Sequence, residues 1–165
     1  MKKPGFTFLE ILVVVGIMLI LLTIVFSSIR MTNASLQSKT HQEVYSMLTE
    51  ASRYARSGVA GSDWGVYFEY DGVTGAAVRA TLFAGENYAT RDTQYDRFTA
   101  FHDSIVFSDV TLVDIAPWSG NGDEITFESM SGDTHQTGSI TLTTASKTTI
   151  VSVDSSGIPL IDYVQ

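Results

Sequence analysis

The chain has 165 residues, about the length of one domain, with 44% hydrophobic and 17% charged residues. This balance is typical of a globular protein and excludes a collagen-like or low-complexity chain. With 18 acidic and 10 basic residues the formal net charge is −8, which argues against nucleic acid as a main partner, and the absence of cysteine excludes disulfides and thiolate chemistry.

The most apolar part of the chain lies near its beginning. Residues Ile11 to Ile29 carry no charge, and as a helix they match the roughly 30 Å hydrocarbon core of a bilayer, so we predict a transmembrane helix. Lys2 and Lys3 precede it, and the positive-inside rule then places the N-terminus in the cytoplasm and the rest outside. A cleaved secretory signal is the alternative, but the run is too long and Ser27-Ser28 makes a poor cleavage site.

Glu10 stands directly before this apolar run. A carboxylate within the membrane costs about 2.5–3.5 kcal/mol on insertion scales, so it needs a partner or a function. Cleavage after Gly5 would create an α-amine on Phe6, four residues before Glu10 and on the same helix face. That amine could pair with Glu10 of its own chain or of a neighbouring helix.

The residues Lys2-Lys3-Pro4-Gly5-Phe6-Thr7-Phe8-Leu9-Glu10, together with the apolar run, resemble the class III signal sequence of type IV pilins and type II secretion pseudopilins. The resemblance implies that prepilin peptidase cuts between Gly5 and Phe6 on the cytoplasmic side and that the new Phe6 amine is methylated. It also implies that Thr7 and Glu10 contact the N-terminal amine and that Glu10 sets the register of subunits during assembly.

The same resemblance implies a structural filament subunit rather than an enzyme. Before assembly, such a subunit is anchored in the inner membrane with its head in the periplasm or exterior. Its partners are membrane lipid, an inner-membrane assembly platform and other pilin or pseudopilin subunits. Helices in lipid gain little hydrophobic energy from each other, so we expect close packing at Gly16 to help hold the bundle. Major pilins usually carry a proline where this chain has Ser27-Ser28. The sequence therefore leaves open whether the subunit is major or minor, and whether the filament is a pilus or a secretion pseudopilus.

The segment from Arg30 to Arg56 lacks glycine and proline and repeats apolar residues at three- and four-residue steps. This pattern predicts an amphipathic helix that continues the first, so that one helix runs from Phe6 to Ser57. The glycine-containing segment Ser57 to Gly61 predicts its end.

After Gly61 the pattern becomes that of short strands separated by glycine-rich turns. Residues 64–83 alternate around an Asp71-Gly72 turn and predict a β-hairpin. Further strands are expected at 104–107, 110–115, 124–128, 139–143 and 148–153 and after the turn at 154–157, with loops at 85–97, 117–123 and 131–138. These elements predict an antiparallel, two-sheet head with the helix stripe packed on one sheet.

The predicted fold class is therefore α+β, with a long N-terminal helix and an antiparallel β head. We expect a leader at residues 1–5, a membrane and assembly helix at 6–29, an amphipathic helix at 30–57 and the head at 58–165. The head pattern, with Arg56-Ser57 before Trp64-Gly65-Val66-Tyr67-Phe68 and Asp154-Ser155-Ser156-Gly157 before the last strand, looks most like GspH/FimT-type minor pseudopilins or minor pilins.

Catalytic and metal motifs are not found in the sequence. His41, His102 and His135 are widely separated and are expected to be exposed, and no cofactor is expected. Two acidic loops, 91–96 and 119–124, offer oxygen ligands for Ca²⁺ but lack EF-hand spacing, so turn formation is favoured there.

Three further interpretations concern the head. Trp118 is interpreted as a plug over a sheet end, with a filament contact as the alternative. A minor pilin whose head binds DNA or a surface is the alternative function. From Met31 onward, however, the chain has 7 basic and 17 acidic residues, and Arg79, Arg91 and Arg97 only faintly suggest a basic cluster. A membrane-tethered enzyme is the third hypothesis.

Overall fold

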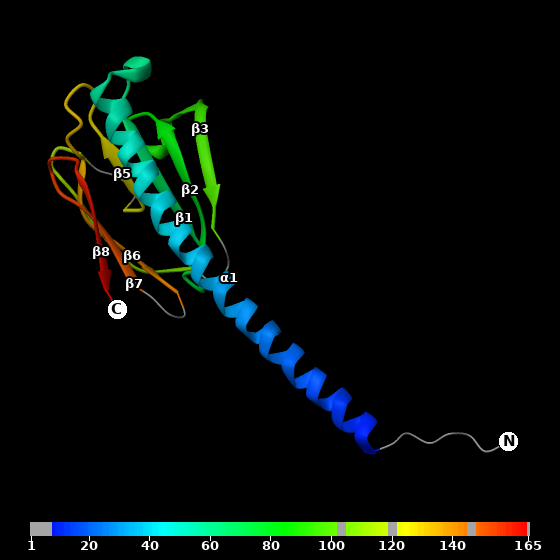
Figure 1. Cartoon of the computed structure of the whole chain (residues 1–165). Helices are drawn as coiled ribbons and strands as arrows, with labels where there is room; N and C mark the ends of the chain where they lie inside the picture. The colour runs from blue at the N-terminus through cyan, green and yellow to red at the C-terminus, as the bar shows by residue number, and fades with distance from the viewer. Residues whose placement is uncertain (1–7, 102–104, 119–121, 145–147, 165) are drawn as a thin grey trace. The chain divides into compact units, whose positions relative to one another are not determined.

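The computed structural model describes residues 8–101, 105–118, 122–144 and 148–164, with the backbone alone for residues 24–38 and 163–164 (Figure 1). Two compact units make up the chain, residues 1–36 and residues 37–165.

The helix α1 runs from Phe8 to Arg56. It ends where Gly58 adopts a left-handed conformation with φ 61°, and the amide of Gly58 donates to the carbonyl of Ala55 at 2.9 Å. Arg53 and Arg56 lie in the last turn, where cations favour the negative end of the helix dipole. Within the described residues, the predicted continuous helix is confirmed.

The first sheet has the strand order β3-β2-β1-β5, with every pair antiparallel. Its strands are β1 (Trp64–Tyr70), β2 (Ala77–Ala84), β3 (Asp92–Ala100) and β5 (Glu124–Phe127). Trp64 pairs with Ala84 and Glu69 with Arg79, so the expected hairpin is confirmed. The expected loop at 85–97 is wrong in its second half, because β3 begins at Asp92.

The second sheet has the order β4-β6-β7-β8 and is also antiparallel. Its strands are β4 (Val106–Asp114), β6 (Gln136–Thr143), β7 (Thr148–Val153) and β8 (Pro159–Val164). The two strands expected at 104–107 and 110–115 are one strand, β4, with a register shift between Phe107 and Asp109. A bulge of this kind breaks the alternation that a sequence pattern relies on.

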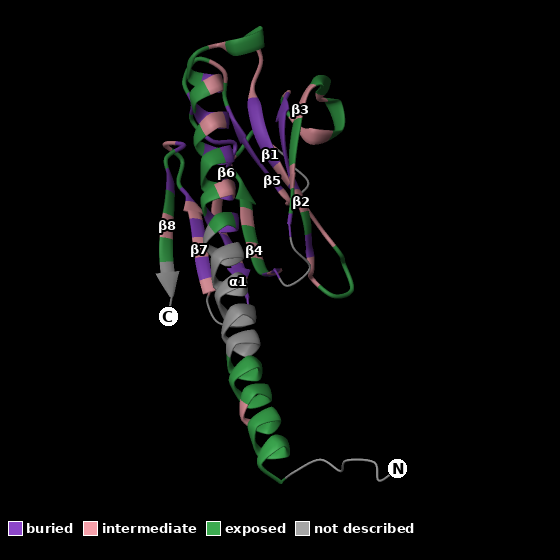
Figure 2. Ribbon diagram, turned by 45° about the vertical axis from the view of Figure 1, so that its right-hand side comes forward, coloured by how far each residue is buried: buried purple, intermediate pink, exposed green. Residues whose placement is uncertain are grey.

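The core of the second unit combines α1 with both sheets (Figure 2). The helix contributes Val44, Leu48, Ala51 and Ala55, which repeat at steps of four and three and are fully buried. The sheets contribute side chains such as Phe68, Leu82, Ile125, Phe127, Ile140, Leu142 and Val151.

Polar contacts also join α1 to both sheets. Ser52 donates to the carbonyl of Gly157 at 3.1 Å beside β8, and the guanidinium of Arg97 on β3 donates to Glu50 at 2.6 Å. The expectation that the helix packs on one sheet is therefore wrong. A helix with apolar residues at both three- and four-residue steps presents a stripe broad enough to cover two sheets.

Candidate functional site

The predicted leader-cleavage and methylation residues, Gly5 and Phe6, and the predicted amine partner Thr7 lie outside the described residues. The described part of the first unit begins at Phe8. Thirteen large apolar side chains between Phe8 and Leu22 are 49–81% exposed. Because they are nearly consecutive along a helix, they point to all its sides rather than to one face.

Glu10 lies in the first turn of α1 and is exposed. An acid there is favoured by the positive end of the helix dipole. Beyond its chain neighbours and the backbone of its own helix turn, a Cβ added to Gly16 would meet no described atom within 4 Å, so the backbone at Gly16 is accessible to a neighbouring helix. The assembly roles of Glu10 and Gly16 stay predictions. Within the described residues, no helix has the length and apolarity needed to cross a membrane.

The histidines expected to be exposed are not exposed where the structure describes them. His41 on α1 and His135, one residue before β6, are each 2% exposed, so the expectation is wrong for both, while His102 lies outside the described residues. Nε2 of His41 lies 3.3 Å from Oγ1 of Thr149 on β7. Both imidazoles therefore belong to the interior of the head.

Trp118 covers His135. Their rings stack with centroids 3.6 Å apart and planes 6° from parallel. On another side of the imidazole, Asp63 Oδ2 lies 3.6 Å from Nε2. Burial of His135 lowers its pKa, against the opposing effect of Asp63 and two glutamates. The stack agrees with the interpretation of Trp118 as a plug.

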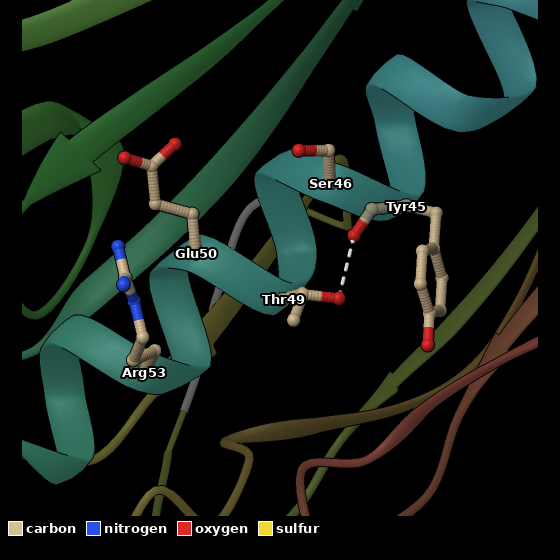
Figure 3. Close-up of a pocket in the computed structure, with 5 residues that line it drawn as sticks. All are labelled: Tyr45, Ser46, Thr49, Glu50 and Arg53. Atoms are coloured by element: carbon tan, nitrogen blue, oxygen red, sulfur yellow. Dashed lines mark hydrogen bonds between the residues drawn. The ribbon is translucent and has the colours of Figure 1, made fainter.

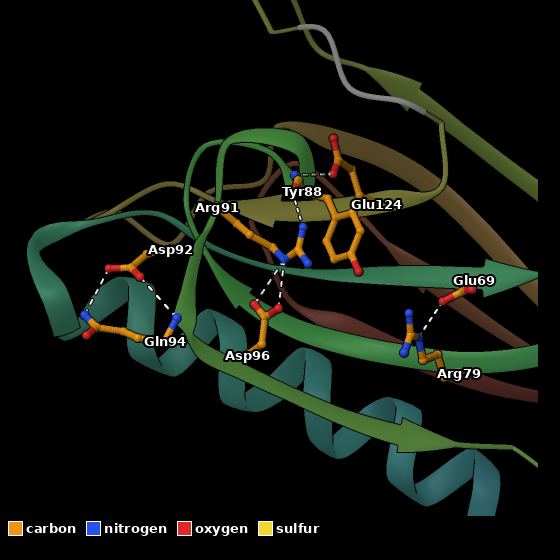
Figure 4. Close-up of polar contacts among 8 residues, drawn as sticks. All are labelled: Glu69, Arg79, Tyr88, Arg91, Asp92, Gln94, Asp96 and Glu124. Carbon is orange, nitrogen blue, oxygen red and sulfur yellow. Dashed lines mark hydrogen bonds and ion pairs between the residues drawn. The ribbon is translucent and has the colours of Figure 1, made fainter.

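The carboxylates of the two acidic loops make separate contacts rather than converging (Figure 4). Asp96 pairs with Arg91 at 2.9 Å, and Asp92 accepts from Gln94. Buried Glu124 accepts the amide hydrogen of Tyr88 at 2.7 Å, and Asp123 accepts from the hydroxyl of Tyr70. No group of three potential metal-ligating residues occurs in the part of the chain that the structure describes.

The arginines that a DNA-binding head would use are each engaged with a carboxylate. Arg79 pairs with Glu69, Arg91 with Asp96 and Arg97 with Glu50. Arg91 also lies over the ring of Tyr88 at 3.6 Å from its centroid. These pairs leave little cationic surface for phosphate on this part of the head.

An open pocket of about 520 Å³ lies along the exposed face of α1 (Figure 3). Its described lining is Tyr45, Ser46, Thr49, Glu50 and Arg53. The hydroxyl of Thr49 donates back to the carbonyl of Tyr45 at 2.8 Å. A second groove of about 440 Å³ shares part of this lining and extends to residues 157–159. The amphipathic pattern of residues 30–56 gave no signal for this groove, because the turn that forms its other wall is about a hundred residues away in the sequence.

Comparison with known proteins concerns the first segment alone. A family model described as the prokaryotic N-terminal methylation motif matches residues 1–26. No curated protein and no solved structure matches the chain. The motif belongs to structural pilin subunits rather than to enzymes, and it implies processing by prepilin peptidase and assembly with other pilins. The match at residues 1–26 supports a type IV pilin-like or pseudopilin-type subunit anchored in a membrane.

Proposed function

We propose that this protein is a minor subunit of a type IV pilus-like filament or type II secretion pseudopilus. In this proposal prepilin peptidase cleaves between Gly5 and Phe6, and the new amine of Phe6 is methylated. Residues 6–29 then span the inner membrane until the subunit joins a helical bundle. The head, of GspH/FimT type, stays on the periplasmic or outer side.

The observation that carries the proposal is the exposure of apolar side chains on all sides of α1 between Phe8 and Leu22. Such a surface is unfavourable in water, because fully burying a large apolar side chain is worth about 1.5–3 kcal/mol relative to leaving it exposed. Lipid before assembly and neighbouring helices after it would both cover the segment. The proposed span extends at each end beyond the side chains that the structure describes.

In this mechanism Glu10 determines the register in which a subunit joins the helical bundle. Exchange of lipid for helix contacts gives little net hydrophobic energy, so packing and polar pairing must select the register. A carboxylate in that environment is most stable beside a cation, and the methylated amine of Phe6 on a neighbouring subunit is the cation that cleavage would create.

The mass of the N-terminal peptide of the membrane-extracted protein tests the processing step. We expect a chain that begins at methylated Phe6, and a Gly5→Glu variant that retains Met1. Recovery of the unsubstituted protein with Met1 intact would contradict the proposal.

Assembly is tested separately with Glu10→Val. We expect this variant to be cleaved and retained in the membrane but depleted from sheared filaments or pseudopili by about tenfold or more, since a lost pairing of about 1.4 kcal/mol changes an equilibrium tenfold. The matched control is Glu43→Val, a partly exposed glutamate on the head portion of α1, which should assemble normally.

A further inference from the structure

The groove on the exposed face of α1 is cationic, although the head is acidic. Its lining includes Tyr45, Arg53 and Arg56 from α1 and Ile158 from the turn before β8. Arg56 donates to the carbonyl of Ser156 at 2.9 Å, and Arg53 lies over the ring of Tyr54. Among the residues that the structure describes, neither arginine forms an ion pair. The charge of Arg53 does act on Glu50, which lies one turn earlier on α1 and is paired with Arg97.

The apolar part of the same groove is incompletely covered. Tyr45 is 38% exposed and Ile158 is 53% exposed, and they stand on opposite walls, one on α1 and one on the turn before β8. A segment that carried one apolar side chain and one carboxylate would satisfy both the apolar walls and the guanidinium groups.

The turn between β1 and β2 is such a segment. Val73 at its tip is 95% exposed, the most exposed of the large hydrophobic side chains that the structure describes. Asp71 accepts hydrogen bonds from the amides of Val73 and Thr74, each at 2.8 Å, and these bonds lower the pKa of Asp71 so that its carboxylate remains charged at mildly acidic pH. The tip, defined here as Asp71–Gly75, contains no basic residue.

The tip is ordered, which lowers the entropy lost on docking. The amide of Gly75 donates to the carbonyl of Asp71 at 2.8 Å, and the amide of Phe107 donates to the carbonyl of Gly75 at 3.0 Å. Gly75 has a positive φ of 69°, which suits the turn. A single exposed apolar residue is ordinary on a protein surface, so exposure alone would mean little. The combination of a fixed tip, a carboxylate and a matching groove is what carries the inference.

Tip and groove are at different places on the head. The tip follows β1 at the end away from Trp64, while the indole of Trp64 donates to the carbonyl of Val59 just beyond the end of α1. Figure 1 shows β1 running back along the helix from that end. Two different complementary surfaces on one chain make a heterologous contact, which repeats from copy to copy and builds an open filament when the rotation does not close.

We propose that the Asp71–Gly75 tip of one copy docks in the α1 groove of a second copy, with Val73 against Tyr45 and Ile158 and with Asp71 facing Arg53 and Arg56. The inference rests on the proposed function, which requires a contact that repeats along a filament. The contact is smaller than the roughly 800 Å² per partner of a stable interface, so it acts together with helix packing and sets the register of the heads.

Cysteine cross-linking of the full chain tests the contact, since the protein has no cysteine of its own. Cells producing the Val73→Cys/Ile158→Cys double variant are oxidised mildly and examined on a non-reducing gel. We expect a ladder of dimers, trimers and higher species, because each copy carries both thiols. The matched control Val73→Cys/Val113→Cys, whose second site is also well exposed, should give no ladder.

The charge component is tested in the same double-cysteine background. Arg53→Glu/Arg56→Glu should lower the cross-linked fraction about tenfold, and Arg53→Lys/Arg56→Lys should retain it. Absence of the ladder, an equal ladder in the Val113→Cys control, or capture of a different protein by Val73→Cys would each overturn the inference.

The N-terminal mass measured on the same sample separates the two proposals. A chain that begins at methylated Phe6 but gives no ladder overturns the head contact and leaves the filament subunit standing. A ladder from a chain with intact Met1 supports the head contact and counts against the proposed processing.

Discussion

At the scale of single residues, His135 is the buried titratable group with the clearest consequence. It is 2% exposed, stacked on Trp118 and close to Asp63. Its pKa is lowered mainly by burial, which outweighs the attraction of Asp63, Glu128 and Glu86 for the charged form. The native head therefore holds this imidazole neutral at pH values where the unfolded chain would already protonate it.

This difference predicts acid sensitivity of the head. Below the ordinary histidine pKa of about 6.5 the unfolded chain binds more protons than the native one, so the free energy of unfolding falls as pH decreases from about 6.5 towards the lowered pKa of His135. Above that window the contribution is fully present. Urea midpoints measured between pH 8 and pH 5 should show this decline.

The control for that experiment is His135→Gln, which cannot gain the proton. Its midpoint should be lower than that of the unsubstituted protein at pH 8, because the stack with Trp118 is lost, and it should vary less between pH 6.5 and pH 5. An equal slope in the two proteins would assign the acid sensitivity to another group.

The sequence contained a signal for the other buried histidine. His41 precedes Val44, Leu48, Ala51 and Ala55 at helical spacing, and all five lie on the buried face. Periodicity thus could have placed His41 in the core, had the residue type not suggested exposure. No comparable signal existed for His135, because its burial depends on Trp118, seventeen positions earlier, folding back over it.

At the scale of elements, the alternation of apolar and polar residues predicted strands well where one face of the strand is buried. β7 has alternating burial over Thr148–Val153, as expected from its sequence. β3 was missed because its residues are largely polar and exposed, and most of its described side chains face water at the sheet edge. Edge strands of this kind carry little hydrophobic pattern, and polar side chains also protect them from aggregation.

Gly138 shows how strand pairing constrains a residue that the pattern assigned to a loop. It lies in β6 with φ 142° and pairs with Leu112 of β4. An added Cβ would collide with the carbonyl oxygen of Thr111. We expect Gly138→Ala to lower the free energy of unfolding by more than about 2 kcal/mol, because β4 and β6 must separate locally.

The matched control for this substitution is Gly72→Ala. Gly72 lies in an exposed turn, has no strained φ and would place its Cβ in open space. Its free energy of unfolding, measured by urea titration, should stay within about 0.5 kcal/mol of that of the unsubstituted protein, as is usual for surface changes. A similar decrease in the free energy of unfolding in both variants would mean that the close approach of β4 and β6 at Gly138 does not cause the destabilisation.

At the scale of the whole molecule, the chain contains two kinds of surface. The first unit exposes apolar side chains along Phe8–Leu22, and the second unit encloses an apolar core within an acidic, cysteine-free domain. The fold class and the N-terminal motif were predictable from local sequence, since periodicity and charge determine them. The groove and the tip were not, because each depends on residues far apart in the chain.

The division into units predicts which fragments fold. Residues 37–165 retain the part of α1 that supplies Val44, Met47 and Leu48 to the core, so this fragment should unfold cooperatively and stay in the aqueous phase of a detergent partition. Residues 58–165 lack those side chains. Burial of each of these three side chains is worth about 1.5–3 kcal/mol. Their total is comparable with the free energy of unfolding of a whole domain, which is about 5–15 kcal/mol. We therefore expect the shorter fragment to lose its urea transition and the full chain to enter the detergent phase. A cooperative transition in residues 58–165 would show that the two sheets hold together without the helix.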